Sequence, residues 1–154
     1  MTGEPRYWIW VFGEIAGLRW VLAERTMAFR STVAPRLRAM AEGDHAILYV
    51  GRSAFHSPTR DVARLAGLAT VLAPPAAGAS VTINSEEFAW TVPIRVDLAL
   101  PERTGPEVRP LVGSLSFVRR PEVWGMYFRS SPQEIPEGDF RVLADAVEAW
   151  GKGA

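Results

Sequence analysis

The strongest pattern in the sequence is a run of six apolar residues near its start, Tyr7–Phe12, which Gly13 follows. The residues are aromatic or β-branched, and such a run indicates a buried β-strand rather than a helix. Strand alternation would place three large rings on one face, and the remaining side chains on the other. The first face would carry Trp8, Trp10 and Phe12, and the second Tyr7, Ile9 and Val11. Three rings on one face could fill a small barrel or line a pocket for a flat ligand, and the pattern leaves both open.

Apolar residues recur at helical spacing near both ends of the chain. This spacing predicts amphipathic helices over about residues 14–25 and 137–150. A shorter helix is predicted over 31–40, with Pro35 in its first turn, where proline is tolerated. Residues 26–31 interrupt the helical spacing, so we expect them to cross the surface as a loop.

Strand signals fill the middle of the chain. Runs rich in β-branched and aromatic residues predict strands at 45–51, 64–72, 90–100 and 133–135. Gly67 indicates a bulge or a close backbone approach in the second run, and Pro93 places the start of the third on an edge or a bulge. The connection over 74–87 is predicted to be long and irregular, and such connections are more often functional than idle. Periodicity does not decide between helix and strand for residues 111–120.

The order of these elements predicts an α+β fold with a small, barrel-like sheet. The chain has 154 residues, 48% of them hydrophobic, which is enough for a substantial core. We see no internal repeat and no break in composition. We therefore expect a single domain over residues 1–154, with its core over about 6–149.

The residue inventory argues against an enzyme. The chain has no cysteine, which excludes disulfides, thiolate metal sites and cysteine nucleophiles. The two histidines, His45 and His56, lack the spacing of a metal site, and the trio His56, Ser57 and Asp61 is a grouping that loops often show by chance. We therefore expect no catalytic residue, no metal and no cofactor. The polar start and the lack of a long apolar run predict a cytoplasmic protein with no membrane partner.

Charge is balanced overall but uneven along the chain. The 17 basic and 17 acidic residues give a formal net charge of zero, which argues against strong nonspecific binding to nucleic acid. However, 16 of the basic residues are arginine, and residues 19–64 hold eight arginines against four acids. Arginine suits bidentate contacts with phosphate and stacking on bases. A basic face on a neutral protein is therefore one hypothesis.

Tryptophan is abundant for a chain of this size, at six residues: Trp8, Trp10, Trp20, Trp90, Trp124 and Trp150. Aromatic rings can stack on a flat base, and each such stack contributes about 1–3 kcal/mol. Packing in the buried core is the alternative role for these rings. The predicted helical positions of Trp20 and Trp150 favour that role for these two residues.

Several segments, taken in order, resemble the EVE domain of the PUA-like group. The resemblance runs from Tyr7 to Val147 and covers nearly the whole chain. The matching segments are Tyr7-Trp8-Ile9, Gly43-Asp44, Ile47–Val50, Ala66-Gly67-Leu68, Pro93–Val96, Pro110-Leu111, Leu115 with Phe117-Val118, Trp124–Phe128, Glu134-Ile135-Pro136 and Asp139-Phe140.

The resemblance implies a PUA-like fold, in which helices flank a mixed, strongly curved, barrel-like sheet. The EVE domain is similar to the YTH domain, which reads N6-methyladenine in RNA, and EVE relatives are implicated in reading 5-methylcytosine and 5-hydroxymethylcytosine in DNA. In such proteins a modified base leaves its stack and is held in an aromatic pocket. By resemblance, the pocket here would consist of Phe12, Gly13, Met27, Ala28, Phe29, Phe88 and Trp90, and phosphate would contact Arg30 and Arg129.

This sequence departs from the family pattern at two places. The loop after the first helix usually carries a tryptophan, where this chain has Met27-Ala28-Phe29. Phe29 could supply the missing ring, or Met27 a softer sulfur contact. Gly13 stands where YTH relatives place a polar side chain that grips the base edge.

Three functions follow as hypotheses. The first is a non-enzymatic module that binds DNA or RNA and holds a flipped, modified base. The second is a pocket for a small heteroaromatic molecule, such as a nucleoside or another metabolite. The third is a protein-interaction domain with a filled barrel. The sequence does not predict the oligomeric state.

Overall fold

Strand β1, Tyr7–Phe12, lies inside the sheet of the computed structural model, which describes residues 3–153. It runs parallel to β3, His45–Val50, and antiparallel to β7, Gln133–Ile135. Its side chains divide as predicted: Trp8 and Trp10 pack in one hydrophobic cluster, and Tyr7 and Ile9 in another. The predicted first strand and its two faces are therefore confirmed.

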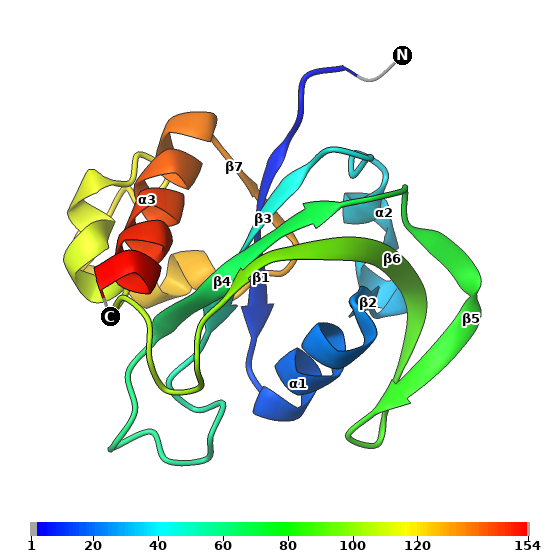
Figure 1. Ribbon diagram of the computed structural model, residues 1–154, viewed down its shortest axis with the longest axis horizontal. Helices are drawn as coiled ribbons and strands as arrows, with labels where there is room; N and C mark the ends of the chain where they lie inside the picture. The colour runs from blue at the N-terminus through cyan, green and yellow to red at the C-terminus, as the bar shows by residue number, and fades with distance from the viewer. Residues whose placement is uncertain (1–2, 154) are drawn as a thin grey trace.

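Seven strands form one strongly curled sheet in the order β2-β6-β4-β3-β1-β7, and β5 pairs with β6 outside this path (Figure 1). The remaining strands are β2 Thr26–Phe29, β4 Arg64–Val71, β5 Ala76–Ile83 and β6 Glu86–Ala99. The predicted α+β fold with a barrel-like sheet is confirmed. β7 comes from the end of the chain and pairs with β1, so both ends of the chain meet in the sheet.

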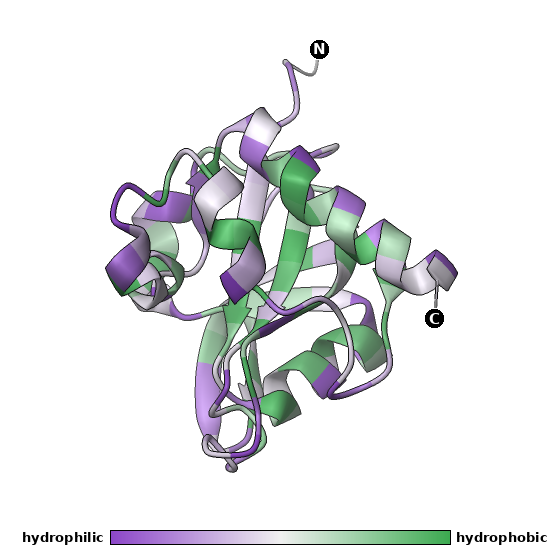
Figure 2. Ribbon diagram, turned by 90° about the vertical axis from the view of Figure 1, so that its left-hand side faces the viewer, coloured by the Kyte–Doolittle hydropathy of each residue, from purple (hydrophilic) through white to green (hydrophobic). Residues whose placement is uncertain are grey.

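Helices cover both faces of the sheet. They are α1 Ile15–Glu24, η1 Ser31–Val33, α2 Ala34–Leu37, η2 Arg109–Ser114, η3 Pro121–Phe128 and α3 Glu137–Gly153. Helix α1 lies inside the curve of β6 and β5, whereas α3 lies on the other side of the sheet (Figure 1). Hydrophobic colour dominates the central strands, and it alternates with polar colour along α3 (Figure 2). Each face of the sheet thus has its own hydrophobic cluster.

Residues 26–31 do not form the predicted surface loop, because residues 26–29 are the strand β2. Helix α1 ends at Arg25, whose φ of 52° turns the chain sharply into β2, and β2 then pairs with β6. The break in helical spacing was real, but it marked a change to a strand. The last three of the four residues of β2 are apolar and buried, so the segment lacks the alternation of apolar and polar residues that predicts a strand.

The predicted irregular connection over 74–87 is also wrong. β5 occupies most of it and forms a hairpin with β6, which begins at Glu86 rather than Trp90. Asn84 and Ser85 join the strands, and both have positive φ, as two-residue hairpin turns require. β5 is almost entirely solvent-exposed, so its sequence lacks the alternating apolar residues that would predict a strand.

Two predicted backbone details have different outcomes. A Cβ at Gly67 would clash with the carbonyl oxygen of Leu98, so the close backbone approach is confirmed. Pro93 does not lie near the start of its strand: it lies inside β6, where the partner of β6 changes from β2 to β4. The undecided segment 111–120 continues the 3₁₀-helix η2 up to Ser114 and contains neither an α-helix nor a strand.

Candidate nucleic-acid interface

The pairing of β2 with β6 brings together two of the residues predicted for the base pocket. Phe29 lies directly opposite Trp90 in the antiparallel ladder, and Ala28 lies opposite Thr91. Directly opposed residues point to the same face of a sheet, with Cβ atoms about 5 Å apart. Phe29 and Trp90 are therefore neighbours on the concave face.

Four of the predicted pocket residues belong to the hydrophobic core. Phe29 is only 4% exposed, and its ring meets Trp10 edge-on, with the ring centroids 5.9 Å apart. Phe12, Met27 and Ala28 are buried as well. The structure therefore gives these side chains a packing role and leaves no ligand space between Phe29 and Trp10.

The other two predicted rings, Phe88 and Trp90, are half-buried and lie where the core meets solvent. Alternate residues of β6 share a face, so Phe88 and Trp90 continue the line of the buried Val92 and Ile94. Burial decreases along this line towards the β5–β6 turn. We call Phe88, Trp90 and the adjacent Arg30 the aromatic rim.

Arg30 joins the rim through two contacts. Its guanidinium lies over the ring of Phe88, 5.6 Å from the ring centroid, and forms an ion pair with Glu86. Both partners of the pair are about half exposed, at 56% and 52%. Arg30 therefore presents a cation beside an aromatic face at the protein surface, with Glu86 as a competitor for any phosphate.

Arg129 is not part of this group. It follows η3, and the preceding Phe128 packs in the cluster on the opposite face of the sheet. Within residues 3–153, no ion pair or cation–π contact joins Arg129 to the aromatic rim. The two predicted phosphate contacts thus lie on separate parts of the structure.

Gly13 and Glu14 form the exposed exit of β1. No atom lies within 4 Å of the position of a Cβ at Gly13, so there is open space beside it. Glu14 accepts a hydrogen bond from the Ala16 N–H, and its Oε2 lies 2.8 Å from Nε2 of His56. The hydrogen bond with His56 lowers the pKa of Glu14. His56 therefore contacts Glu14 and not Asp61, which instead forms an ion pair with Arg103.

None of the seven residues predicted for the base pocket lines the apolar cavity beside α1 or the two clefts that border Trp8 and Arg6. Within the described residues 3–153, no group of three or more histidine, aspartate or glutamate side chains is placed to hold a metal ion. No helix in that part of the chain is both long enough and apolar enough to span a membrane.

Trp20 on α1 is half-buried and packs against the same cluster as Trp90, which agrees with the core role favoured for this helical position. Sequence reasoning missed one feature of this region. The indole N–H of Trp10 is buried and has no hydrogen-bond acceptor among the described residues. The alternation of β1 predicted that Trp10 would be buried, but nothing in the sequence shows that its N–H would lack a partner.

The fold is that of YTH domains, a curled half-barrel with flanking helices. The Mmi1 YTH domain has a TM-score of 0.70 at 11% sequence identity, over 100% of this chain and 81% of that one. The YTH domain of Zygosaccharomyces rouxii MRB1 was solved in complex with N6-methyladenosine RNA. It has a TM-score of 0.63 at 13% sequence identity, over 94% of this chain and 88% of that one.

A third similar structure is Rpa0253 from Rhodopseudomonas palustris, with a TM-score of 0.55 at 14% identity, over 93% of both chains. No protein-family model matches this sequence, and no curated protein does either. At such low identities the similarity shows a YTH-like fold and not a shared ligand. Membership of the EVE family stays a prediction.

Proposed function

We propose that this protein is a non-enzymatic module that binds nucleic acid and holds an unstacked base against the aromatic rim. The observation that carries the proposal is the half-buried Trp90, which lies directly opposite the buried Phe29 and on the same face as Phe88. A ring that is fixed by the core on one side and open to solvent on the other is a ready platform for a base. Stacking on such a ring contributes about 1–3 kcal/mol per base.

Arg30 supports the same proposal through charge. A guanidinium that lies over an aromatic ring at the surface can contact a phosphate while the neighbouring ring receives the base. Phosphate contacts position a strand, whereas contacts with the base provide selectivity. We therefore assign phosphate binding to Arg30 and base stacking to Trp90 and Phe88, and we keep Arg129 as a second phosphate contact farther along the strand.

Among the partners to test, the structural neighbours favour RNA. The MRB1 YTH domain was solved with N6-methyladenosine RNA, and an mmi1 YTH structure is a complex with RNA. N6-methyladenine in RNA is therefore the first base to test, and 5-methylcytosine in DNA, which the EVE resemblance suggests, is the second. Of the rest of the predicted pocket, the buried Phe12, Met27 and Ala28 would support the platform from the core, and Gly13 would leave open space at the exit of β1.

A small heteroaromatic ligand enclosed between Phe29 and Trp90 is less well supported, because Phe29 is buried against Trp10. We also propose that residues 1–154 act as one domain, since β7 and β1 join the two ends of the chain in one sheet. A cytoplasmic location stays a prediction from the sequence.

The test is a titration of labelled single-stranded RNA and DNA, with and without the two modified bases, at two salt concentrations. Trp90→Ala should weaken binding by about 5- to 150-fold, the equivalent of about 1–3 kcal/mol. Trp150→Ala is the matched control, because Trp150 is an exposed tryptophan on α3, which lies on the other side of the sheet from α1 (Figure 1). The proposal fails if no oligonucleotide binds, or if Trp90→Ala binds as well as Trp150→Ala does. In that case a protein-interaction role becomes the better hypothesis.

A further inference from the structure

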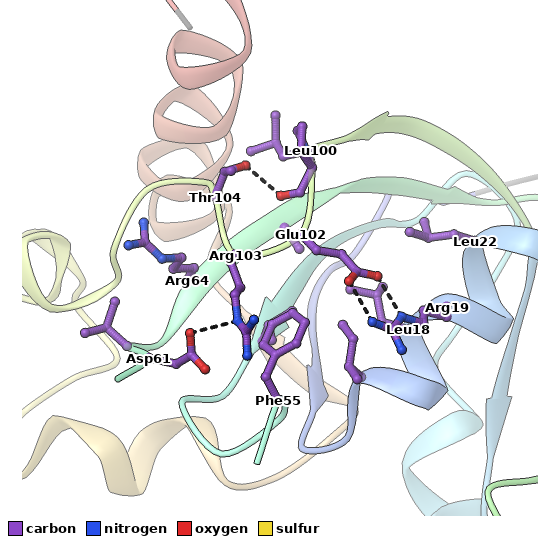
Figure 3. Close-up of a pocket in the computed structure, with 15 residues that line it drawn as sticks. Leu18, Arg19, Leu22, Phe55, Asp61, Arg64, Leu100, Glu102, Arg103 and Thr104 are labelled. Atoms are coloured by element: carbon purple, nitrogen blue, oxygen red, sulfur yellow. Dashed lines mark hydrogen bonds and ion pairs between the residues drawn. The ribbon is translucent and has the colours of Figure 1, made fainter. Parts of the chain in front are cut away.

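An apolar cavity lies on the flank of α1 (Figure 3). Helix α1 forms one wall, and the end of β3, the start of β4 and the loops that contain Phe55 and Arg103 form the other walls. Ile15, Leu18, Leu22, Val50, Phe55 and Leu100 make the lining largely hydrophobic. Neither Phe88 nor Trp90 lines this cavity, so it is separate from the proposed nucleic-acid site.

Two ion pairs border the cavity. Arg19 donates two hydrogen bonds of 2.7 Å to the carboxylate of Glu102, and these bonds lower the pKa of Glu102. Arg103 forms an ion pair with Oδ1 of Asp61 at 3.2 Å, and its guanidinium stacks 4.5 Å from the centroid of the Phe55 ring. The first ion pair ties α1 to the loop that contains Glu102, and the second ties that loop to the loop that contains Asp61, so both hold the walls of the cavity in place.

The second carboxylate oxygen of Asp61 is unusual. Oδ2 is buried and has no hydrogen-bond partner among the described residues, and only 11% of the side chain is exposed. A buried acceptor without a donor costs about 1–3 kcal/mol. Since Asp61 also lines the cavity, a molecule bound there could supply the missing donor.

The size of the cavity limits the ligand. Its volume is about 40 Å³, counted as the space open to the centre of a water molecule. One water needs about 10–15 Å³ by this measure, so about three waters fit, with a combined volume of about 90 Å³. That volume matches one six-membered ring, whereas a fused bicyclic ring would require the walls to move.

Charge limits the ligand further. Three arginines line the cavity, Arg19, Arg64 and Arg103, against the two carboxylates of Asp61 and Glu102. The surroundings therefore already hold more positive than negative charge, which disfavours a cationic ligand. A neutral ring with an N–H group satisfies Oδ2 of Asp61 without adding charge.

We propose that this cavity binds a neutral, single-ring heteroaromatic molecule of the pyrimidine-base type, which packs against Phe55 and donates an N–H hydrogen bond to Oδ2 of Asp61. This site does not depend on the aromatic rim. Any attached sugar would lie at the mouth of the cavity, beside the exposed Val62.

The experiment is a titration of the ¹⁵N-labelled protein with cytidine and uridine, and with adenosine and guanosine as bicyclic comparisons. We expect the pyrimidine nucleosides to shift amide signals from residues 15–22, 55–62 and 100–104, and to bind at least about tenfold more tightly than the purines do. Asp61→Asn, which replaces the acceptor with an N–H₂ group, should weaken pyrimidine binding about tenfold, a typical cost for one lost hydrogen bond. Asp145→Asn, on the exposed face of α3, should change nothing.

Phe55→Leu keeps the wall apolar but removes the ring, and it carries the test if Asp61→Asn does not fold. Trp90→Ala should leave nucleoside binding unchanged, and Phe55→Leu should leave oligonucleotide binding unchanged, so the two proposed sites can fail independently. Pyrimidines that cause no shifts, shifts that map elsewhere, or equal binding of purines would each overturn the proposal.

Discussion

The indole N–H of Trp8 donates a hydrogen bond of 2.9 Å to Oδ2 of Asp44, and both side chains are 2% exposed. Asp44 also accepts hydrogen bonds from the backbone N–H groups of Arg6 and Ala41. One carboxylate thus connects the segment before β1, β1 itself and the turn before β3. This arrangement stabilises the parallel pairing that places Tyr7 opposite His45.

Asp44→Ala should therefore destabilise the protein strongly. The substitution leaves three N–H donors without their acceptor, one of them the buried indole of Trp8, and each hydrogen bond to a charged group contributes about 1.5–3 kcal/mol. We expect a loss of at least about 3 kcal/mol in the free energy of unfolding, measured by urea denaturation. Asp145→Ala on the exposed face of α3 should change it by no more than about 0.5 kcal/mol. Equal midpoints for the two variants would contradict this role for Asp44.

The sequence was most informative where side chains are buried on a regular period. β1 was predicted with its bounds and both faces, because Trp8, Trp10 and Phe12 alternate with residues that pack on the other side. Helices α1 and α3 follow from their apolar stripes in the same way. Gly67 was informative for a different reason, because only a missing side chain allows the backbone of Leu98 so close.

The sequence was least informative for β2 and β5. β2 is four residues long, and β5 is exposed, so their strand conformation depends on pairing with β6 and not on a local pattern. The same limit applies to the site. Resemblance predicted Phe29 and Trp90 as parts of one pocket, but only the three-dimensional packing distinguishes the buried Phe29 from the half-buried Trp90. Nothing in the sequence predicts that Oδ2 of Asp61 is buried without a hydrogen-bond partner among the described residues.

Gly67→Ala tests the close approach between β4 and β6. A methyl group at this position would meet the carbonyl oxygen of Leu98, which belongs to the backbone and cannot rotate away. We expect the substitution to lower the free energy of unfolding by more than about 2 kcal/mol. Gly113→Ala in η2 is the matched control, because no atom lies within 4 Å of its added Cβ, and its stability should be within about 0.5 kcal/mol of the wild type. A well-tolerated Gly67→Ala would show that the two strands can separate at low cost.

Tyr49 should make stability depend on pH in the alkaline range. Its ring stacks on Phe128 with the centroids 4.8 Å apart, and burial raises the pKa of its hydroxyl from 10.0 to about 12. In the unfolded chain the hydroxyl would lose its proton near pH 10, whereas the folded protein holds that proton until about pH 12. The stability that the Tyr49 hydroxyl contributes to the folded state is therefore fully present below pH 10 and is lost as the pH rises towards 12.

Tyr49→Phe keeps the stacked ring and removes the titrating hydroxyl. Unfolding measured in steps from pH 9 to pH 12 should show a shallower loss of stability in the variant than in the wild type, and the tyrosinate absorbance of the folded variant should lack the step near pH 12. Identical slopes for the two proteins would mean that Tyr49 titrates freely in the folded state.

Glu86 should limit nucleic-acid binding, because it already occupies the guanidinium of Arg30. Glu86→Gln removes the competing charge and leaves Arg30 over the ring of Phe88, so oligonucleotide affinity should rise several-fold at low salt. The plot of log affinity against log salt should steepen by up to about one unit, since one more phosphate contact forms. Arg30→Ala should have the opposite effect on both quantities.

Glu122→Gln is the matched control. It makes the same change in net charge, and it frees Arg120 from an exposed ion pair. That ion pair is far from the aromatic rim in the sequence. If Glu86→Gln and Glu122→Gln raise the affinity equally, the effect comes from net charge alone, and Arg30 does not contact phosphate.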